Sequence, residues 1–284
     1  MPRVGRKFIG IVKISRQIMA CILLLEDDEV TARLAIRMLS KQGHHVLHEV
    51  HTEEAWLRLE EAPIDLLILD SQLDGENGWD FLARIRGDIL FKELPVIIYT
   101  STVQRDVIQR YLKLGVQGIL VKPAAAERMN QETERVTRVP WRKSLFEPEQ
   151  DVEKRAGLAA GDVTRLYREA AKELSDAIEE VGVLAEDPAN ASAISRVSAL
   201  KSCALNIGYT RLKQVMDAIT SALEAKDGER IRAMTERLPA ALQLLIMQAG
   251  DEIELDESGA EKETPDSVTE SNAEAAPDAE PAKT

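Results

Sequence analysis

The sequence predicts an α/β domain, built on a doubly wound five-stranded parallel sheet, followed by an all-α four-helix bundle. Two observations carry this prediction. Between residues 21 and 123, short apolar runs alternate five times with amphipathic stretches, which is the pattern of strands and helices in turn. Beyond residue 160 the short apolar runs disappear, and apolar residues recur at intervals of three and four, which is the spacing of one helix face.

The five predicted strands are mostly apolar, and a predicted helix follows each of them. Strands without a polar face are typical of a parallel sheet that helices cover on both sides. The strands are CILLLE at 21–26, HVLHEV at 45–50, DLLILD at 65–70, PVIIYT at 95–100 and GILVKP at 118–123. The helices are TARLAIRMLS at 31–40, EEAWLRLEE at 53–61, FLARIR at 81–86, VIQRYLKLG at 107–115 and a weakly amphipathic segment at 124–138.

The second half follows a linker that we predict at residues 139–159, where Pro140 precedes a charged stretch. In residues 160–250, the apolar spacing defines four helices that short loops would join into an antiparallel bundle. The helices run through Leu166, Ala170, Leu174, Ala177 and Val181; through Ile194, Val197, Leu200 and Ala204; through Leu212, Met216, Ile219 and Leu223; and through Ile231, Met234, Leu238, Leu242 and Leu245.

Composition and charge exclude several classes of function. The chain has 284 residues, 44% of them hydrophobic, yet no apolar run approaches the length of a membrane span. Its formal net charge of -13 opposes binding to nucleic-acid phosphates, so we expect no nucleic-acid partner and no membrane. Residues 251–284 hold twelve acidic residues and few large apolar ones, and we expect this acidic tail to be disordered.

Two further features bear on the cellular location. Residues 1–18 are basic and lack the cleavage site of a secretory signal, so we interpret them as an N-terminal extension, with Met19 as an alternative start to Met1. The only cysteines, Cys21 and Cys203, fall in a predicted strand and a predicted helix, which disfavours a disulfide framework. We therefore expect a cytoplasmic protein.

Polar residues stand at the carboxyl ends of four predicted strands, where open α/β sheets place their working groups. Glu26 and Asp27 follow the first strand, and Asp70, Thr100 and Lys122 follow three others. Three carboxylates brought together repel one another unless a cation neutralises them, and oxygen ligands suit Mg²⁺. We expect an Mg²⁺ site in which Asp70 is a carboxylate nucleophile, Lys122 offsets charge on a phosphoryl group, and the Thr100 hydroxyl donates to it.

The segments LLLEDDEV, LLILDSQLDGENGW, VIIYTST and GILVKP resemble the four signature segments of response-regulator receiver domains of two-component systems. The resemblance covers about residues 19–138 and implies a flavodoxin-like receiver fold. It implies that Asp70 is the phosphoacceptor, that Glu26, Asp27, Asp70 and the Gln72 backbone carbonyl bind Mg²⁺, that Thr100 and Lys122 contact the phosphoryl group, and that the Lys122–Pro123 peptide bond is cis.

The sequence departs from the receiver pattern at two positions. Asp74 stands where the family usually has a proline, a change that we expect to alter only the loop. Ile119 stands where the family usually has a Tyr or Phe that turns inward on phosphorylation, which puts the usual relay from the hydroxyl in doubt.

Four histidines, at positions 44, 45, 48 and 51, invite a metal hypothesis. On a strand their side chains would alternate between the two faces and could not converge on one ion. We therefore expect surface or loop histidines.

Part of the helical half resembles histidine phosphotransfer domains. The segment RVSALKSCALNIGYTRLKQVMDAITSALEAKDGERI matches their core at Leu200, Lys201, Asn206, Ile207 and Gly208. Ser198 stands at the position of the phosphorylated histidine, and no histidine follows His51, so this region cannot pass phosphoryl groups by that route. Ser198 and Lys201 lie three residues apart and would share a docking face. The alternative is an unrelated helical bundle, for example a dimerisation module.

These observations predict a response regulator of a phosphorelay, not an enzyme, whose receiver domain promotes its own phosphotransfer and dephosphorylation. A histidine kinase or histidine phosphotransfer protein would supply the phosphoryl group to Asp70, and the helical half would act by docking to a partner receiver or by homodimerisation. One alternative is a DNA-binding transcription regulator, although the long Glu-rich helices disfavour a basic recognition helix. Another is an adaptor or decoy that competes for phosphorelay partners without needing Asp70.

Overall fold

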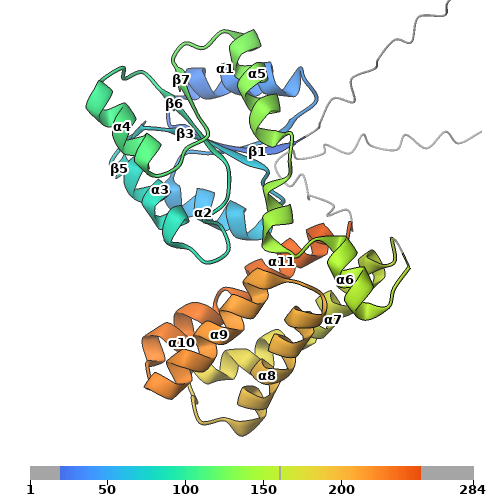
Figure 1. The fold of residues 1–284 in the computed structure, drawn as a ribbon. Coiled ribbons are helices and arrows are strands. Elements are labelled where there is room, and N and C mark those ends of the chain that lie inside the picture. The colour runs from blue at the N-terminus through green and yellow to red at the C-terminus, as the bar shows by residue number, and fades with distance from the viewer. Residues whose placement is uncertain (1–19, 160, 251–284) are drawn as a thin grey trace, which may run out of the picture. The chain divides into compact units, whose positions relative to one another are not determined.

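The computed structural model describes residues 20–159 and 161–250, which belong to one compact unit. Its first part is a five-stranded parallel sheet in the order β2-β1-β3-β6-β7 (Figure 1). The strands are β1 (Cys21–Leu25), β2 (His45–Glu49), β3 (Leu66–Asp70), β6 (Val96–Thr100) and β7 (Gly118–Val121). Every residue of β1, β3 and β6 is buried, as expected for central strands that helices cover on both faces. The predicted parallel sheet is confirmed.

Helices cover the two faces of this sheet. α1 (Glu29–Ser40) and α5 (Ala126–Thr137) lie together on one face, where Leu39 and Met129 join a fully buried cluster with Ile22 and Ile68. α2 (Thr52–Glu61), α3 (Gly78–Gly87) and α4 (Arg105–Lys113) lie on the other side (Figure 1). All five parallel strands therefore end at the same edge of the sheet, and this edge carries the predicted site.

A short hairpin follows β3 that the apolar pattern did not predict. It pairs β4 (Gln72–Leu73) with β5 (Glu76–Asn77) through Gly75, which has a φ of 72°. α3 begins directly after it, at Gly78, where a Cβ atom would lie 2.4 Å from the Asp70 backbone oxygen. Only glycine permits this approach, so the end of β3 and the start of α3 are in direct contact.

The predicted linker at 139–159 is itself structured. It contains a 3₁₀ helix, η1 (Trp141–Leu145), and a short α-helix, α6 (Glu149–Ala156). The buried Trp141 indole donates to the Ile64 carbonyl at 3.0 Å, and Arg142 pairs with Asp65 at 2.8 Å. The linker is therefore tied to the start of β3, at the sheet edge opposite Asp70.

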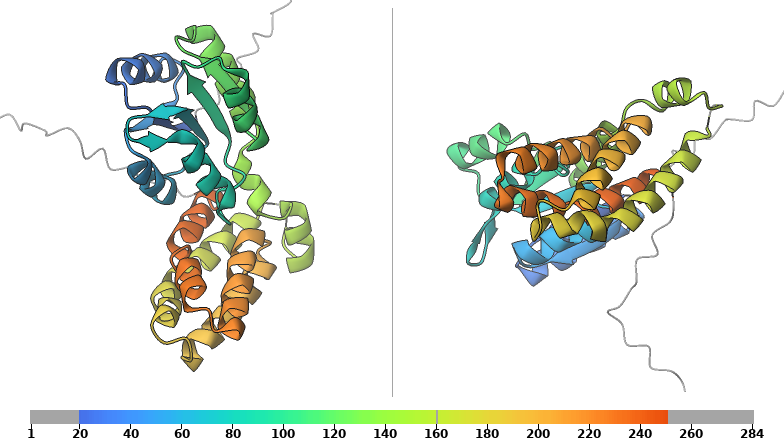
Figure 2. Two further views of the ribbon diagram at one scale, coloured as in Figure 1. Left: turned by 90° about the vertical axis from the view of Figure 1, so that its left-hand side faces the viewer. Right: turned by 90° about the horizontal axis from the view of Figure 1, so that it is seen from below.

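The helical half consists of α7 (Val163–Gly182), η2 (Val183–Ala185), α8 (Ala191–Asn206), α9 (Thr210–Ala225), α10 (Gly228–Thr235) and α11 (Leu238–Gln248). α8 packs between α7 and α9, and α11 packs along α7 (Figure 2). The prediction of one last helix from Ile231 to Leu245 is wrong, because the chain breaks it into α10 and α11. Pro239 stands in the first turn of α11 and cannot donate the backbone hydrogen bond that a continuous helix needs. Within the described residues, five α-helices therefore follow α6 instead of four.

Side chains of the helical half also contact the receiver part of this unit. α11 packs against α2. Arg237, at the start of α11, pairs with Glu60 at 2.7 Å and with Asp88 at 3.4 Å. Its guanidinium lies 5.3 Å from the centre of the Trp56 ring. These contacts involve the carboxyl ends of α2 and α3.

Several further predictions have definite outcomes. Cys21 and Cys203 are free, in a strand and a helix as predicted. His44 lies in the loop before β2, within the prediction of surface or loop histidines, but it is buried, and its Nδ1 accepts a hydrogen bond from the Ala20 backbone. No helix in residues 20–159 and 161–250 is long and apolar enough to cross a membrane. The N-terminal extension at 1–18, the choice of Met1 or Met19 as the start, and the acidic tail at 251–284 lie outside the described residues.

Candidate phosphoacceptor site

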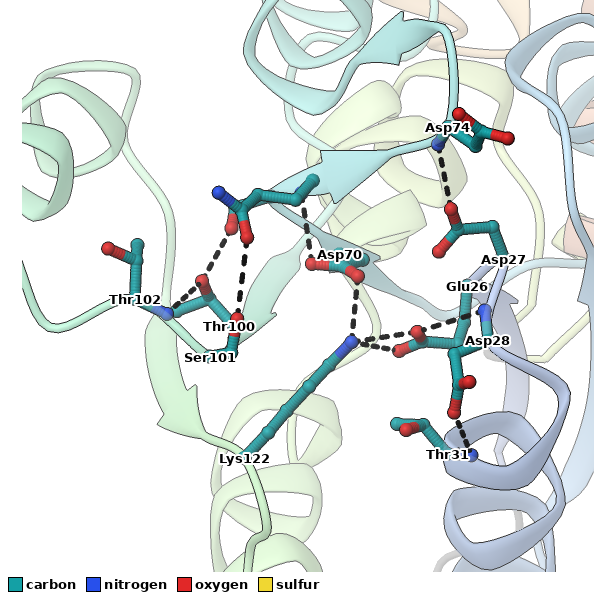
Figure 3. Close-up of polar contacts among 12 residues, drawn as sticks. Glu26, Asp27, Asp28, Thr31, Asp70, Asp74, Thr100, Ser101, Thr102 and Lys122 are labelled. Atoms are coloured by element: carbon teal, nitrogen blue, oxygen red, sulfur yellow. Dashed lines mark hydrogen bonds and ion pairs between the residues drawn. The ribbon is translucent and has the colours of Figure 1, made fainter.

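The predicted polar residues do meet at one edge of the sheet (Figure 3). Glu26 follows the last residue of β1, Asp70 ends β3, Thr100 ends β6, and Lys122 follows the last residue of β7. Glu26, Asp70 and Thr100 are 1%, 5% and 1% exposed. They lie together because parallel strands in register deliver their carboxyl ends to the same edge.

Lys122 is the cation of this cluster. Its ammonium lies 2.7 Å from Asp70 Oδ2 and 2.5 Å from Glu26 Oε2, and 5.1 Å from the centre of the Tyr99 ring. Burial opposes the charge of Lys122, but hydrogen bonds to Asp70 and Glu26 outweigh burial and raise its pKa. Burial raises the pKa of Glu26 to about 7, against the opposing effect of Lys122. The raised pKa of Lys122 keeps its ammonium charged beside Asp70 and Glu26.

The donor set fits a hard divalent cation. Glu26, Asp27 and Asp70 each offer a carboxylate oxygen, and these three oxygens lie within 4.8 Å of one another. A single lysine leaves this group of carboxylates with excess negative charge, and oxygen-only ligands suit Mg²⁺ better than a softer metal. The predicted ligand set is therefore brought together, and the Gln72 backbone stands two residues beyond Asp70 with its N–H donating to Asp70 Oδ1 at 3.0 Å.

Backbone N–H groups orient the side chain of Asp27 and that of its neighbour Asp28. Asp74, in the turn of the β4–β5 hairpin, donates its N–H to Asp27 Oδ2 at 2.7 Å (Figure 3). Asp28 caps α1 through the Thr31 N–H at 2.7 Å, which fixes the direction of the chain just after Asp27. A proline at position 74 would have no N–H to give, so this departure from the receiver pattern adds a hydrogen bond to the site.

Thr100 lies within a network of hydroxyl groups. Its Oγ1 accepts from the Thr102 N–H at 3.0 Å and lies 2.5 Å from Ser71 Oγ. The phenol of Tyr111, on α4, donates to the Ser71 carbonyl at 3.3 Å. Burial and the charge of Asp70 raise the pKa of Tyr111 to about 12, so its phenol keeps its proton. The Lys122–Pro123 peptide bond is cis, as predicted.

Sequence reasoning missed Ser71 and Tyr111. From the sequence, Ser71 is a loop residue after the predicted phosphoacceptor. Tyr111 occupies one apolar position of a predicted amphipathic helix. A signal was present, because Tyr111 is the one aromatic residue in the predicted helix at 107–115, and a buried tyrosine hydroxyl usually has a partner. Ile119, which departs from the receiver pattern, is half-buried on β7.

The predicted docking pair on α8 is only partly available. Ser198 is exposed, and its hydroxyl donates to the Ile194 carbonyl of its own helix. Lys201 is half-buried and pairs with Asp217 of α9 at 2.6 Å. Hydrogen bonds from Lys201 and Lys213 lower the pKa of Asp217. Lys201 therefore joins α8 to α9.

Comparison with known proteins agrees with the geometry of the acidic site. Residues 22–134 match the family model of the response regulator receiver domain. The chemotaxis protein CheY1 of Helicobacter pylori is 35% identical over 115 residues, which cover 39% of this chain and 93% of CheY1. The chain belongs to the family of response regulator receiver proteins, and its receiver domain is similar to chemotaxis proteins of the CheY type. Receiver domains accept phosphoryl groups from histidine kinases, so the chain takes part in phosphorelay signalling.

Two other similarities concern the receiver part. The sensor histidine kinase AruS of Pseudomonas aeruginosa is 30% identical over 112 residues, but these cover only 11% of AruS. The solved structure of the chemotaxis protein CheY4 of Vibrio cholerae is 24% identical and covers 42% of this chain and 99% of CheY4, with a TM-score of 0.40.

Proposed function

We propose that the chain is a response regulator that takes a phosphoryl group on Asp70 from a phosphohistidine donor. The observation that carries the proposal is that the Asp70 carboxylate lies 2.7 Å from the Lys122 ammonium and offers an oxygen within 4.8 Å of oxygens of Glu26 and Asp27. An Asp70 carboxylate oxygen attacks phosphorus, a P–O bond forms, and the P–N bond to the donor histidine breaks. The imidazole of the donor keeps the electron pair and takes up a proton. No output enzyme is part of this proposal, and the receiver domain promotes its own phosphotransfer and dephosphorylation.

The residues around Asp70 have separate roles in this reaction. Lys122 balances the charge of the transferred group, and the Thr100 hydroxyl donates to a phosphoryl oxygen once the group has arrived. Glu26, Asp27, Asp70 and the Gln72 carbonyl would hold Mg²⁺, which polarises phosphoryl oxygens when it is bound. Asp27 is held in place for this by the Asp74 N–H.

The helical half would serve as a protein-docking or dimerisation module. α8 carries Ser198 on an exposed face, and Lys201 is paired with Asp217, so this face offers few free charges to a partner. We place the reaction in the cytoplasm, a location that the two free cysteines support.

The test is phosphorylation of the full chain by a small phosphodonor. Incubation with acetyl phosphate and Mg²⁺ should add the mass of one phosphoryl group to the wild type, measured on the intact protein. Asp70→Asn should gain nothing, because the amide is not a nucleophile. Asp80→Asn, which changes an exposed aspartate on α3, is the matched control and should gain one group. A wild type without any gain would contradict the proposed function.

A further inference from the structure

A buried chain of polar contacts, through the Ser71 hydroxyl and the Ser71 backbone carbonyl, leads from the acidic site to helix α4. The Thr100 hydroxyl lies 2.5 Å from the Ser71 hydroxyl, and the Tyr111 phenol donates to the Ser71 carbonyl at 3.3 Å. The three residues are 1%, 8% and 3% exposed. Water cannot readily replace partners at such positions, so these groups depend on one another for hydrogen bonds.

Ser71 stands in the middle of this chain and has little freedom to move alone. It is bonded directly to Asp70, and α3 closes on it from the other side, since a Cβ on Gly78 would lie 3.3 Å from the Ser71 Cα. A displacement of the Ser71 backbone therefore also moves the Ser71 carbonyl, which accepts the hydrogen bond from Tyr111.

Tyr111 is the main attachment of α4. It is the one buried residue of this nine-residue helix, and no side chain caps the amino end of α4. Near it, Leu112 is 54% exposed and Val103, before α4, is 68% exposed. A short helix with a single buried side chain has low local stability, so a shift of Tyr111 would move α4 and the apolar surface beside it.

We propose that Ser71 and Tyr111 are positioning residues for the switch: Ser71 holds the Thr100 hydroxyl at rest, and Tyr111 passes its release to α4. This inference rests on the proposed function, because release follows when Thr100 turns its hydroxyl proton to a phosphoryl oxygen on Asp70. To reach that oxygen, the Thr100 hydroxyl has to move away from Ser71 toward Asp70, which breaks the 2.5 Å contact whichever of the two hydroxyls donates in it at rest. The Ser71 hydroxyl then takes a new partner, and the hydrogen bond from Tyr111 to the Ser71 carbonyl changes with it.

The chain has four tyrosines, so fluorine NMR of protein labelled with 3-fluorotyrosine should give four resolvable signals. Tyr111→Phe identifies the Tyr111 signal by its loss. Tyr167→Phe is the matched control, because Tyr167 is fully buried and its hydroxyl has no hydrogen-bond partner among the described residues. The Tyr167 signal should stay in place throughout.

Two arms then test the relay. Without phosphodonor, Thr100→Ala should move the Tyr111 signal by more than its linewidth. With acetyl phosphate and Mg²⁺, the wild-type Tyr111 signal should move in proportion to the phosphorylated fraction, measured by intact mass. In Ser71→Ala, the movement per phosphorylated molecule should fall to less than half.

The outcomes separate the relay from the proposed function. A phosphoryl gain with an unmoved Tyr111 signal overturns the relay and leaves Asp70 as phosphoacceptor. A wild type that gains no phosphoryl group overturns the proposed function. The arm without phosphodonor then decides the relay alone, since an unmoved Tyr111 signal in Thr100→Ala shows that no coupling exists.

Discussion

The Asp27 carboxylate accepts a hydrogen bond from the backbone N–H of Asp74 at 2.7 Å. A hydrogen bond from a neutral N–H to a carboxylate holds that group in one orientation. Groups that orient metal ligands commonly change metal affinity by about 10- to 100-fold when they are lost. The backbone N–H of residue 74 therefore influences the metal affinity of the acidic site.

Asp74→Pro should weaken Mg²⁺ binding by about 10-fold, because proline removes the N–H that holds Asp27. The measurement is a titration of Mg²⁺ followed by tryptophan fluorescence, because Trp79, one of the three tryptophans, lies two residues after the end of the hairpin. Asp74→Ala is the matched control, because it removes the side chain and keeps the N–H. Equal Mg²⁺ affinities for the two variants would contradict a role for the backbone donor.

The acidic site was largely predictable from sequence, and its surroundings were not. Asp70 and Lys122 are identifiable because each follows an apolar run that reads as a strand, and parallel strands share an edge. The Ser71–Tyr111 hydrogen bond joins a loop to a helix forty residues away. Nothing in local periodicity reports such a contact, because the pattern shows which face is buried and not which polar atoms meet there.

Among the secondary-structure elements, α3 is joined to two neighbouring loops through one side chain. The Arg86 guanidinium donates to the carbonyls of Leu114 at 2.8 Å, Lys92 at 3.1 Å and Leu94 at 2.9 Å, and to that of Gly115 at 3.3 Å. Burial lowers the pKa of Arg86. The planar fork of an arginine can serve several acceptors at once, whereas a lysine ammonium is a compact point donor.

Arg86→Lys should lower the free energy of unfolding by about 2 kcal/mol, because hydrogen bonds to charged groups contribute roughly 1.5–3 kcal/mol and some carbonyls would lose their donor. Urea denaturation measures the change. Arg110→Lys, on the exposed face of α4, makes the same substitution without this set of acceptors and should change stability by less than about 0.5 kcal/mol. Equal effects would show that the Arg86 fork has no special role.

The elements themselves followed apolar periodicity closely in the sheet and less closely in the helical half. Buried strands such as Leu66–Asp70 have a short, continuous apolar run that is typical of a strand, so they were predictable from the sequence. The predicted helix from Ile231 to Leu245 failed because its apolar spacing continues in phase through a break at Glu236 and Arg237. Pro239 was the local signal, but proline is also common in the first turn of a helix, so the sequence alone allowed either interpretation.

Across the described residues, two arginines of the helical half form ion pairs with the receiver part, Arg211 with Glu93 at 3.3 Å and Arg237 with two carboxylates. Arg237 pairs with Glu60 and Asp88, and its side chain is 15% exposed. The guanidinium carbons of Arg237 and Arg84 lie 5.3 Å and 4.0 Å from the centre of the Trp56 ring. These contacts lie at the carboxyl ends of α2 and α3, whereas Asp70 lies at the carboxyl end of β3. Arg237 therefore does not cover the acidic site.

Reversing the charge of Arg237 should uncouple the unfolding of the two parts. In Arg237→Glu, three carboxylates would face one another in a partly buried place, and removing a partner from buried ion pairs costs about 3 kcal/mol or more. All three tryptophans lie at or before position 141, so tryptophan fluorescence follows the receiver part and linker, while circular dichroism at about 222 nm also follows α7 to α11. In the wild type both probes should give one urea midpoint, as in a single cooperative transition. In Arg237→Glu the helical signal should be lost at lower urea than the fluorescence signal.

The matched control is Arg232→Glu, on the exposed face of α10, which should keep the two midpoints together. Coincident midpoints in Arg237→Glu would mean that the remaining contacts, the packing of α11 against α2 and the Arg211–Glu93 ion pair, are enough to couple the two parts.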